Sequence, residues 1–242
     1  MARVKILGIE VDAVTMAQAV ERVENLIVQK KSSLVATANA EMLLNATHDA
    51  ELKKILNAAD LVVPDGAGTV WAAHHLGFEM PERVAGFDLV QELMKISPAR
   101  GIKFFLFGAA PTIADKAKLK AEELYPGVKI VGTRNGYFKP EDEPEIISQI
   151  KRCQPDVLLA ALGVPKQEKW LFKHKDELKI PVSIGVGGTF DVMAGVVRRA
   201  PLWMQKAKLE WLFRAMLQPS RAGRLLALPK FVWKVHKQKV NG

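Results

Sequence analysis

Residues 61–68 of the chain, Leu-Val-Val-Pro-Asp-Gly-Ala-Gly, join a short apolar run to an acidic, glycine-rich exit. The run lacks the alternation of apolar and polar residues that is typical of a strand with one solvent-exposed face. This indicates a strand buried on both faces, as in a parallel sheet. The glycines mark a tight turn before a helical stretch. The segment therefore predicts one strand–turn–helix unit, with Asp65 at the carboxyl end of the strand.

Similar units recur as far as about residue 195. Short β-branched runs alternate with longer amphipathic stretches, such as residues 16–28, which begin at a capping box of Thr15 and Gln18. Repeated strand–helix units join parallel strands by right-handed crossovers. We therefore predict an α/β fold with a Rossmann-like, doubly wound and mainly parallel sheet. The predicted strands are residues 4–9, 34–37, 61–63, 104–107, 129–132, 157–162 and 182–186, and two further predicted helices are residues 114–124 and 145–151.

The composition excludes several classes of protein. The single cysteine, Cys153, rules out an internal disulfide framework and a Cys-rich zinc site, and it suits a reducing compartment. The apolar stretch at the start of the chain is too short and too acidic for a signal peptide. No segment approaches the roughly 18–20 apolar residues that a spanning helix needs. We therefore expect a cytoplasmic protein or one that lies on a membrane face without crossing it.

The net charge of +9 is unevenly distributed over the 242 residues. Residues 198–242 hold eleven Lys or Arg and one acid, Glu210, which gives a local net charge of +10. Residues 1–197 hold 24 basic and 25 acidic side chains. This change coincides with the end of the strand–helix units. We therefore predict an α/β body at residues 1–195 and a basic, helical appendage at residues 196–242.

The appendage contains three helical patterns, at residues 202–217, 221–228 and 230–239. Trp203, Trp211 and Trp233 stand there among Leu and basic residues. This mixture is typical of an interfacial amphipathic segment that faces anionic lipid. Helices packed on the body with a solvated basic face would show a similar pattern, and so would a nucleic-acid-binding surface. The many Leu and Trp side chains favour the membrane surface over nucleic acid.

Three residues at predicted strand exits are candidates for chemistry, because a doubly wound sheet binds its ligand at the carboxyl ends of the strands. Asp65 follows one strand, while Thr37 and Asn39 stand at the end of another. Asp65 would either act on a bound substrate or cap the next helix. Thr37 and Asn39 have the same two interpretations, as functional residues or as plain turn and capping residues.

Four more residues stand at or near predicted exits. Arg83 lies in a Gly- and Pro-bounded segment, where a planar guanidinium suits phosphate or carboxylate binding and a solvated side chain is as common. Gly187 offers a backbone N–H that would bind a diphosphate. Gln167 would contact a base edge or a sugar hydroxyl, or serve only as a polar residue of a first helical turn. Tyr137 follows the predicted strand at residues 129–132.

Motifs for several common chemistries are absent from the sequence. It has no complete G-x-G-x-x-G and no P-loop, which argues against a kinase, a P-loop ATPase or an ordinary NAD enzyme. It also has no H-E-x-x-H, no Asp-x-Asp pair and no G-x-S-x-G elbow. We therefore expect no metal and no cofactor; if the protein is an enzyme, we expect it to work by an acid–base group and electrostatics.

A series of short motifs is specific in combination, although each is weak alone. In chain order they are Thr37-Ala-Asn39, Pro64-Asp65-Gly66, Arg83-Val-Ala-Gly86-Phe-Asp88, Gly163-x-Pro165-Lys166-Gln167-Glu168, Gly185-Val-Gly187-Gly188-x-Phe190-Asp191, Arg199-Ala-Pro201, Glu210-Trp211, Arg214 and Pro219-x-Arg221-x-x-Arg224. Across essentially the whole chain, this combination resembles the WecG/TagA/CpsF glycosyltransferases, family 26.

The resemblance implies an inverting glycosyltransferase of teichoic acid linkage-unit synthesis. Such an enzyme moves N-acetylmannosamine (ManNAc) from UDP-ManNAc to the C4 hydroxyl of GlcNAc on undecaprenyl diphosphate. Its partners would be these two substrates and the anionic inner face of the cell membrane, with no nucleic acid. The alternatives are another donor, such as UDP-N-acetylmannosaminuronic acid (UDP-ManNAcA), a non-catalytic nucleotide-binding protein that docks on membranes, or a DNA-associated α/β protein. The apolar face of the appendage would also allow a homo-oligomer in solution.

The resemblance also implies roles for individual residues. Asp65 would be the general base that removes the acceptor hydroxyl proton, assisted by Thr37 and Arg83. Asn39 would help Thr37 and Arg83 to position the two substrates, and Gln167 would hold the nucleotide sugar. The other predicted substrate-binding residues are Tyr137 and Gly187 in the body and Arg214, Arg221 and Arg224 in the appendage.

Those three arginines would neutralise the leaving diphosphate when the appendage closes over the pocket. The chain departs from the family at residues 108–111, which read Gly-Ala-Ala-Pro where members often have more glycine. Whether this turn contacts the diphosphate is therefore left open by the sequence.

Overall fold

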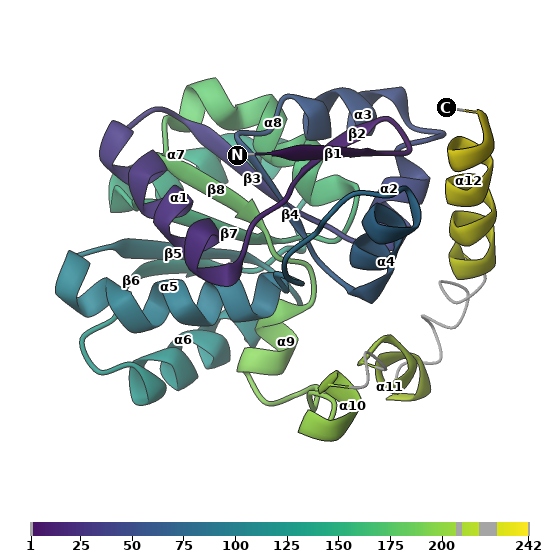
Figure 1. Cartoon of the computed structure of the whole chain (residues 1–242). Coiled ribbons are helices and arrows are strands. Elements are labelled where there is room, and N and C mark those ends of the chain that lie inside the picture. The colour runs from purple at the N-terminus through teal and green to yellow at the C-terminus, as the bar shows by residue number, and fades with distance from the viewer. Residues whose placement is uncertain (1, 207–209, 218–226, 242) are drawn as a thin grey trace.

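A computed structural model of the chain describes residues 2–206, 210–217 and 227–241. Its centre is a six-stranded parallel sheet with the strand order β4-β3-β8-β7-β5-β6 (Figure 1). The predicted α/β class, with a Rossmann-like and mainly parallel sheet, is confirmed. The strands are β3 (Ser33–Ala38), β4 (Leu61–Pro64), β5 (Lys103–Gly108), β6 (Lys129–Arg134), β7 (Val157–Ala161) and β8 (Val182–Gly185).

Helices cover both faces of this sheet, and each face has its own apolar core. In β3, for example, Leu34 and Ala36 belong to one core and Val35 to the other. Burial on both faces explains why the strands are continuous apolar runs in the sequence. One core includes α2 (Ala40–Asn45), α3 (Ala50–Asn57), α4 (Ala67–His75), α7 (Glu143–Cys153) and α8 (Lys166–Leu178), and the other includes α1 (Met16–Gln29), α5 (Gly86–Arg100), α6 (Ile113–Leu124) and α9 (Thr189–Met193).

The prediction of one strand at residues 4–9 is wrong. The segment forms an antiparallel hairpin of β1 (Arg3–Ile6) and β2 (Ile9–Asp12), which is separate from the six-stranded sheet. Leu7 and Gly8 have φ angles of 49° and 82°, the left-handed pair that a two-residue hairpin turn requires. Asp12 then accepts a hydrogen bond from the Val62 N–H at 2.8 Å. The hairpin thereby covers the edge strand β4.

The appendage is described in three pieces. The pattern predicted as one helix at residues 202–217 corresponds to α10 (Leu202–Lys206) and α11 (Glu210–Leu217). The predicted helix at residues 230–239 lies within α12 (Ala227–Asn241), and most of the predicted helix at residues 221–228 lies outside the described residues. Within the described ranges, none of the helices has the length and apolar character to cross a bilayer.

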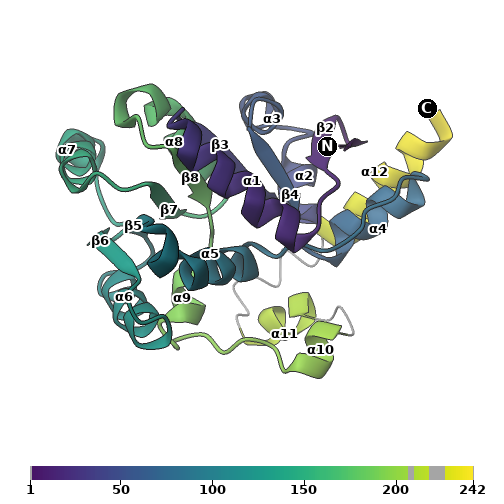
Figure 2. The ribbon, with the colours of Figure 1, turned by 60° about the vertical axis from the view of Figure 1, so that its left-hand side comes forward.

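The last helix, α12, packs on the body beside α2 and α4 (Figures 1 and 2). Phe231 and Val235 are fully buried in the core that α2, α4 and the hairpin share. Gln238 binds the hairpin backbone, because its amide donates to the Lys5 carbonyl and accepts from the Leu7 N–H, both at 2.8 Å. The end of the basic appendage is therefore joined to the body by apolar packing and by hydrogen bonds.

Candidate active site

Thr37 and Asp65 stand at the carboxyl ends of two adjacent strands. β3 and β4 pair in parallel, and the Asp65 N–H donates to the Ala38 carbonyl at 2.9 Å. The nearly buried Thr37 hydroxyl donates to the Gly185 carbonyl, at the end of β8, over 3.1 Å. The exits of β4, β3 and β8 therefore meet around Thr37.

Asp65 is not the N-cap of the helix that follows it. That position belongs to Gly66, which has a φ of +93° and gives α4 no side-chain capping bond. Such a backbone conformation favours glycine, since it carries no Cβ. The positive end of the α4 dipole therefore lies next to Asp65. This placement favours a functional role for Asp65 over simple capping.

Asn39 is a capping residue, as the simpler of its two interpretations predicted. Its Oδ1 atom accepts from the Met42 N–H at 2.9 Å and fixes the start of α2. A Cβ on Gly66 would lie 3.7 Å from the Asn39 Cβ, which places Asn39 beside the turn that carries Asp65. A contact between Asn39 and substrate stays a prediction.

Arg83 reaches the same edge of the sheet on the segment before α5. The Val84 N–H donates to the Pro64 carbonyl at 3.0 Å, so this segment lies along the end of β4. Gly86 packs on Thr37 so closely that a Cβ would lie 2.8 Å from the Thr37 Cγ2 atom. A larger residue at this position would push the segment away from Thr37.

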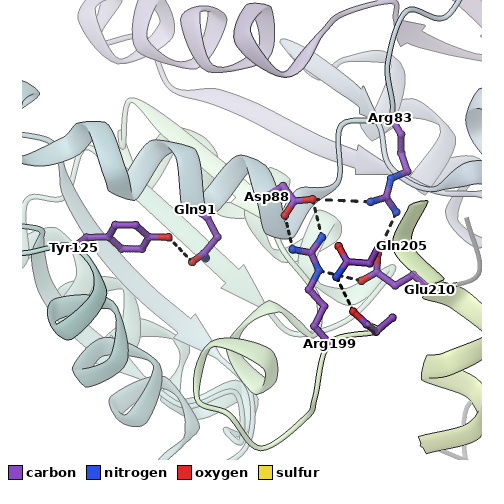
Figure 3. A network of polar contacts seen from close by, with 8 residues as sticks. Arg83, Asp88, Gln91, Tyr125, Arg199, Gln205 and Glu210 are labelled. Atoms are coloured by element: carbon purple, nitrogen blue, oxygen red, sulfur yellow. Dashed lines mark hydrogen bonds and ion pairs between the residues drawn. The ribbon is translucent and has the colours of Figure 1, made fainter. Parts of the chain in front are cut away.

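Arg83 belongs to a network of two arginines and two carboxylates (Figure 3). Arg199 donates to both oxygens of Asp88, at 2.6 and 2.7 Å, and its Nε atom lies 3.4 Å from Glu210. Arg83 lies 3.1 Å from Glu210 and 3.9 Å from Asp88. Burial opposes the Arg199 charge, but the two carboxylates outweigh it and raise the pKa of Arg199. This ionic network, formed by Arg83, Asp88, Arg199 and Glu210, joins α5 to the first part of the appendage.

Gln167 ties together the exits of β7 and β8. Its Oε1 atom accepts from the N–H groups of Gly163, at 3.2 Å, and Gly187, at 3.0 Å. Its Nε2 atom donates to the Glu168 Oε1 atom at 2.7 Å. The side chain is therefore occupied by partners within the protein and is almost completely buried. A direct contact between Gln167 and the nucleotide sugar stays a prediction. The prediction that the Gly187 N–H binds a diphosphate is wrong for this structure, because that N–H is already paired with Gln167.

Glu168 is a buried carboxyl group at the same edge, and it was not among the site residues predicted from the sequence. Only 1% of the residue is exposed, and its Oε2 atom has no hydrogen-bond partner. Burial raises the pKa of Glu168 to about 7, although the hydrogen bond from Gln167 acts in the opposite direction. The Lys166-Gln167-Glu168 motif gave the only signal, because it placed a carboxylate next to a candidate residue.

Among the described helices of the body, six begin without a side-chain hydrogen bond from their N-cap residue: α4, α5, α6, α7, α8 and α9. In contrast, α1, α2 and α3 begin with Thr15, Asn39 and Asp49 as capping side chains. A helix start without a cap keeps N–H donors and the positive end of its dipole for an external anion. Several of these starts directly follow sheet strands, so the edge is suited to bind the phosphates of a nucleotide.

Comparisons with known proteins agree with this geometry. The family described as "Glycosyl transferase WecG/TagA/CpsF family" matches residues 4–242. The chain belongs to this family. Two similar proteins, from Staphylococcus aureus strains NCTC 8325 / PS 47 and MRSA252, are each 34% identical over 240 residues, which cover 98% of this chain and 94% of the relative. Both are named N-acetylglucosaminyldiphosphoundecaprenol N-acetyl-beta-D-mannosaminyltransferase. The protein is therefore a glycosyltransferase.

In this member of the WecG/TagA/CpsF family, six of the predicted site residues lie at adjoining strand exits: Thr37, Asn39, Asp65, Arg83, Gln167 and Gly187. Tyr137 follows β6 at the far edge of the sheet, and 72% of it is exposed, but its neighbours Gly136 and Phe138 approach Leu162 and Lys166 after β7. Arg221 and Arg224 lie outside the described residues, as does the side chain of Arg214. Their predicted contacts with the diphosphate stay predictions.

The turn at residues 108–111 is close-packed in this glycosyltransferase. Gly108 has a φ of +125°, and a Cβ on it would lie 2.5 Å from the Ala161 backbone. The Ala109 N–H donates to the Ala161 carbonyl at 2.8 Å and is therefore already paired. Among the described residues, no three His, Cys, Asp or Glu side chains are grouped so that they could hold a metal ion.

Proposed function

We propose that the protein transfers ManNAc from UDP-ManNAc to the C4 hydroxyl of GlcNAc on undecaprenyl diphosphate and forms a β-1,4 bond in teichoic acid linkage-unit synthesis. The observation that carries this proposal is the 34% identity, over 98% of the chain, to relatives named for the same acceptor and the same sugar. The meeting of polar groups and uncapped helix starts at one edge of the sheet supports it.

In the proposed mechanism, Asp65 acts as the general base. Transfer with inversion needs one base on the face of the sugar opposite the leaving group, and that base removes the proton of the attacking hydroxyl. The acceptor oxygen then forms the new bond to the anomeric carbon as the bond to UDP breaks. Asp65 is suited to this role because it stands at a strand exit, next to the start of α4, where Gly66 supplies no capping side chain. Thr37 and Arg83, from neighbouring segments, would orient the two sugars.

The negative charge that develops on UDP would be stabilised without a metal. The helix starts after β7 and β8 provide N–H groups, and Gly187 has open space where a side chain would be. Arg214, Arg221 and Arg224 would add positive charge when the appendage closes over the bound donor.

We also propose that the protein works at the cytoplasmic face of the cell membrane. In the described part of the appendage, Trp203, Trp211, Met216 and Trp233 are exposed, and Lys230, Lys237 and Lys239 lie on the exposed surface of α12. Exposed Trp and Lys side chains of this kind suit an interface with anionic lipid. Such a position would bring the acceptor, which is held in the membrane by its lipid, to the carboxyl edge of the sheet.

The test is sugar transfer with defined substrates and excess EDTA. UDP release, together with a product heavier by one N-acetylhexosamine, is expected from UDP-ManNAc and a short-chain lipid diphosphate of GlcNAc. Faster transfer from UDP-ManNAcA would reassign the donor. UDP binding without transfer from either donor would favour the non-catalytic alternative, and activity that EDTA abolishes would contradict metal independence.

A further inference from the structure

A buried hydrogen-bonded unit connects the exits of β7 and β8. We call it the amide clamp, and it consists of Gly163, Gln167, Glu168 and Gly187. One amide oxygen accepts from two backbone N–H groups that are 24 residues apart in the sequence, and the amide nitrogen donates to a buried carboxyl group. Both glycines have positive φ angles, +80° and +52°, with open space where a Cβ would lie. The backbone of each turn is therefore fixed by Gln167, while the space next to the Cα atom of each glycine is unoccupied.

We propose that Glu168 is a positioning residue for glycosyl transfer, which fixes the Gln167 amide so that the turns after β7 and β8 keep the shape of the donor site. This inference rests on the proposed function, since it takes these turns to bind the UDP part of the donor. Glu168 itself is almost completely buried and accepts a hydrogen bond from Gln167, so it acts through Gln167.

The hydrogen-bonding groups of the clamp leave the amide only one favourable orientation. Gly163 and Gly187 both present N–H donors, so the oxygen of the amide must face them. The nitrogen then points into the protein, where Glu168 Oε1 is its acceptor. Without that acceptor, the buried nitrogen would lose its partner, and rotation of the amide toward water would release both glycine N–H groups.

The clamp also supports the end of β8 and, through it, Thr37. A Cβ on Gly185 would lie 2.6 Å from the Gln167 Nε2 atom and 2.8 Å from the Glu168 Oε1 atom, so the strand lies directly against the pair. The Gly185 carbonyl accepts the hydrogen bond from the Thr37 hydroxyl. Loss of the clamp would therefore alter the conformation of both donor turns and also the position of Thr37, which lies beside Asp65.

The experiment compares Glu168→Met, which removes the acceptor at similar size, with Glu168→Gln, which keeps an acceptor oxygen. For Glu168→Met we expect amide hydrogen exchange at Gly163 and Gly187 to be about tenfold faster and UDP to bind about tenfold more weakly, as for a lost buried hydrogen bond. The KM for the nucleotide sugar should rise with a smaller change in kcat. Glu168→Gln should stay close to the wild type in all three measurements. The matched control is Asp176→Asn, which changes an exposed carboxylate on the same helix.

The proposal would be overturned if Glu168→Met bound UDP as the wild type does and its Gly163 and Gly187 amides exchanged at the wild-type rate. It would also be overturned if Glu168→Gln changed hydrogen exchange and UDP affinity as much as Glu168→Met does. If Glu168→Met does not fold, Gln167→Met removes the clamped amide itself and should give the same exchange and UDP results; unchanged values there would also overturn it. UDP affinity and hydrogen exchange need no sugar transfer. A protein that transfers no sugar would therefore refute the proposed function while these two measurements still decide the role of Glu168.

Discussion

Asp65 is the residue on which the proposed chemistry depends most directly. Asp65→Asn keeps the size of the side chain but removes its ability to accept a proton. We expect kcat to fall by about 10²–10⁴, the usual contribution of a positioned general base. UDP should bind with nearly unchanged affinity, because the proposed base acts on the acceptor. Steady-state transfer and calorimetric UDP titration measure the two effects separately, and near-normal turnover would exclude Asp65 as the base.

The pKa of Glu168 predicts a pH dependence of stability. The folded-state pKa is about 7, raised by burial from an ordinary value of 4.5. Between these values the unfolded chain has lost the proton while the folded protein keeps it, so the free energy of unfolding falls as pH rises from about 4.5 to about 7. Glu168→Gln cannot titrate, and it should lack this loss, which amounts to about 1–3 kcal/mol.

Urea unfolding of the wild type and Glu168→Gln, at about pH 5 and about pH 8, measures the difference. The variant should gain stability relative to the wild type at the higher pH. An equal change in both proteins between the two pH values would contradict the raised pKa. Asp176→Asn controls for the loss of a carboxylate as such, since Asp176 is exposed.

Strand exits could be predicted from the sequence, and side-chain partners at those exits could not. Thr37 and Asp65 each end an apolar run, so local pattern was enough to place them at one edge of the sheet. Glu168 is the third residue of an amphipathic helix, where a carboxylate is normally solvated. Its burial depends on Gly185, seventeen positions further along the chain, and no local pattern reports such a contact.

At the scale of elements, α12 has two faces with different expected roles. Phe231 is 1% exposed and packs in the core, whereas Trp233, on the same helix, is 61% exposed. We expect Phe231→Ala to lower the free energy of unfolding by about 3–5 kcal/mol. Trp233→Ala should change it by less than about 0.5 kcal/mol and should weaken sedimentation with anionic vesicles. Urea unfolding and vesicle sedimentation of both variants test the pair, and equal stability losses would contradict the docking of α12.

The ionic network gives a second prediction at this scale. Arg199→Met removes the two-bond contact with Asp88 and the contact with Glu210. Because these side chains are partly exposed, we expect a loss of only about 1–2 kcal/mol. The first part of the appendage should then be cleaved faster by protease, since its link to α5 is broken. In a double-mutant cycle, Arg199→Met should cost less in an Asp88→Asn background than in the wild type. Equal costs in the two backgrounds would show that direct pairing with Asp88 does not account for the effect.

Elements with strong apolar periodicity were predicted well, and those set by a single turn were not. Both apolar cores consist mainly of strands and helices that the apolar periodicity of the sequence predicted. The hairpin was missed, because Leu7 and Gly8 give little turn signal within an apolar run, and only their left-handed φ angles reverse the chain. Packing of the appendage on the body was one of the predicted alternatives, but the partners of α12 could not be predicted, because they lie on α2 and α4, far away in the sequence.

For the molecule as a whole, the division of charge has a consequence for activity at the membrane. Residues 198–242 carry a net charge of +10, while the rest of the chain is close to neutral. Attraction to anionic lipid should therefore act on the appendage and weaken with salt, since about 0.5 M salt shortens the screening length to a few ångströms. The donor site should keep its shape under the same conditions, because the clamp and the strand exits are held by short internal hydrogen bonds.

We expect high salt to reduce transfer to a vesicle-bound acceptor several-fold while transfer to a water-soluble, short-chain acceptor changes little. Parallel assays with anionic and zwitterionic vesicles separate surface charge from the lipid anchor of the acceptor. Zwitterionic vesicles should support slow transfer at every salt concentration, since they lack the attraction that salt would screen. If salt lowers transfer equally for both acceptors, the effect lies in the active site. The charge of the appendage would then have no part in bringing the enzyme to its membrane substrate.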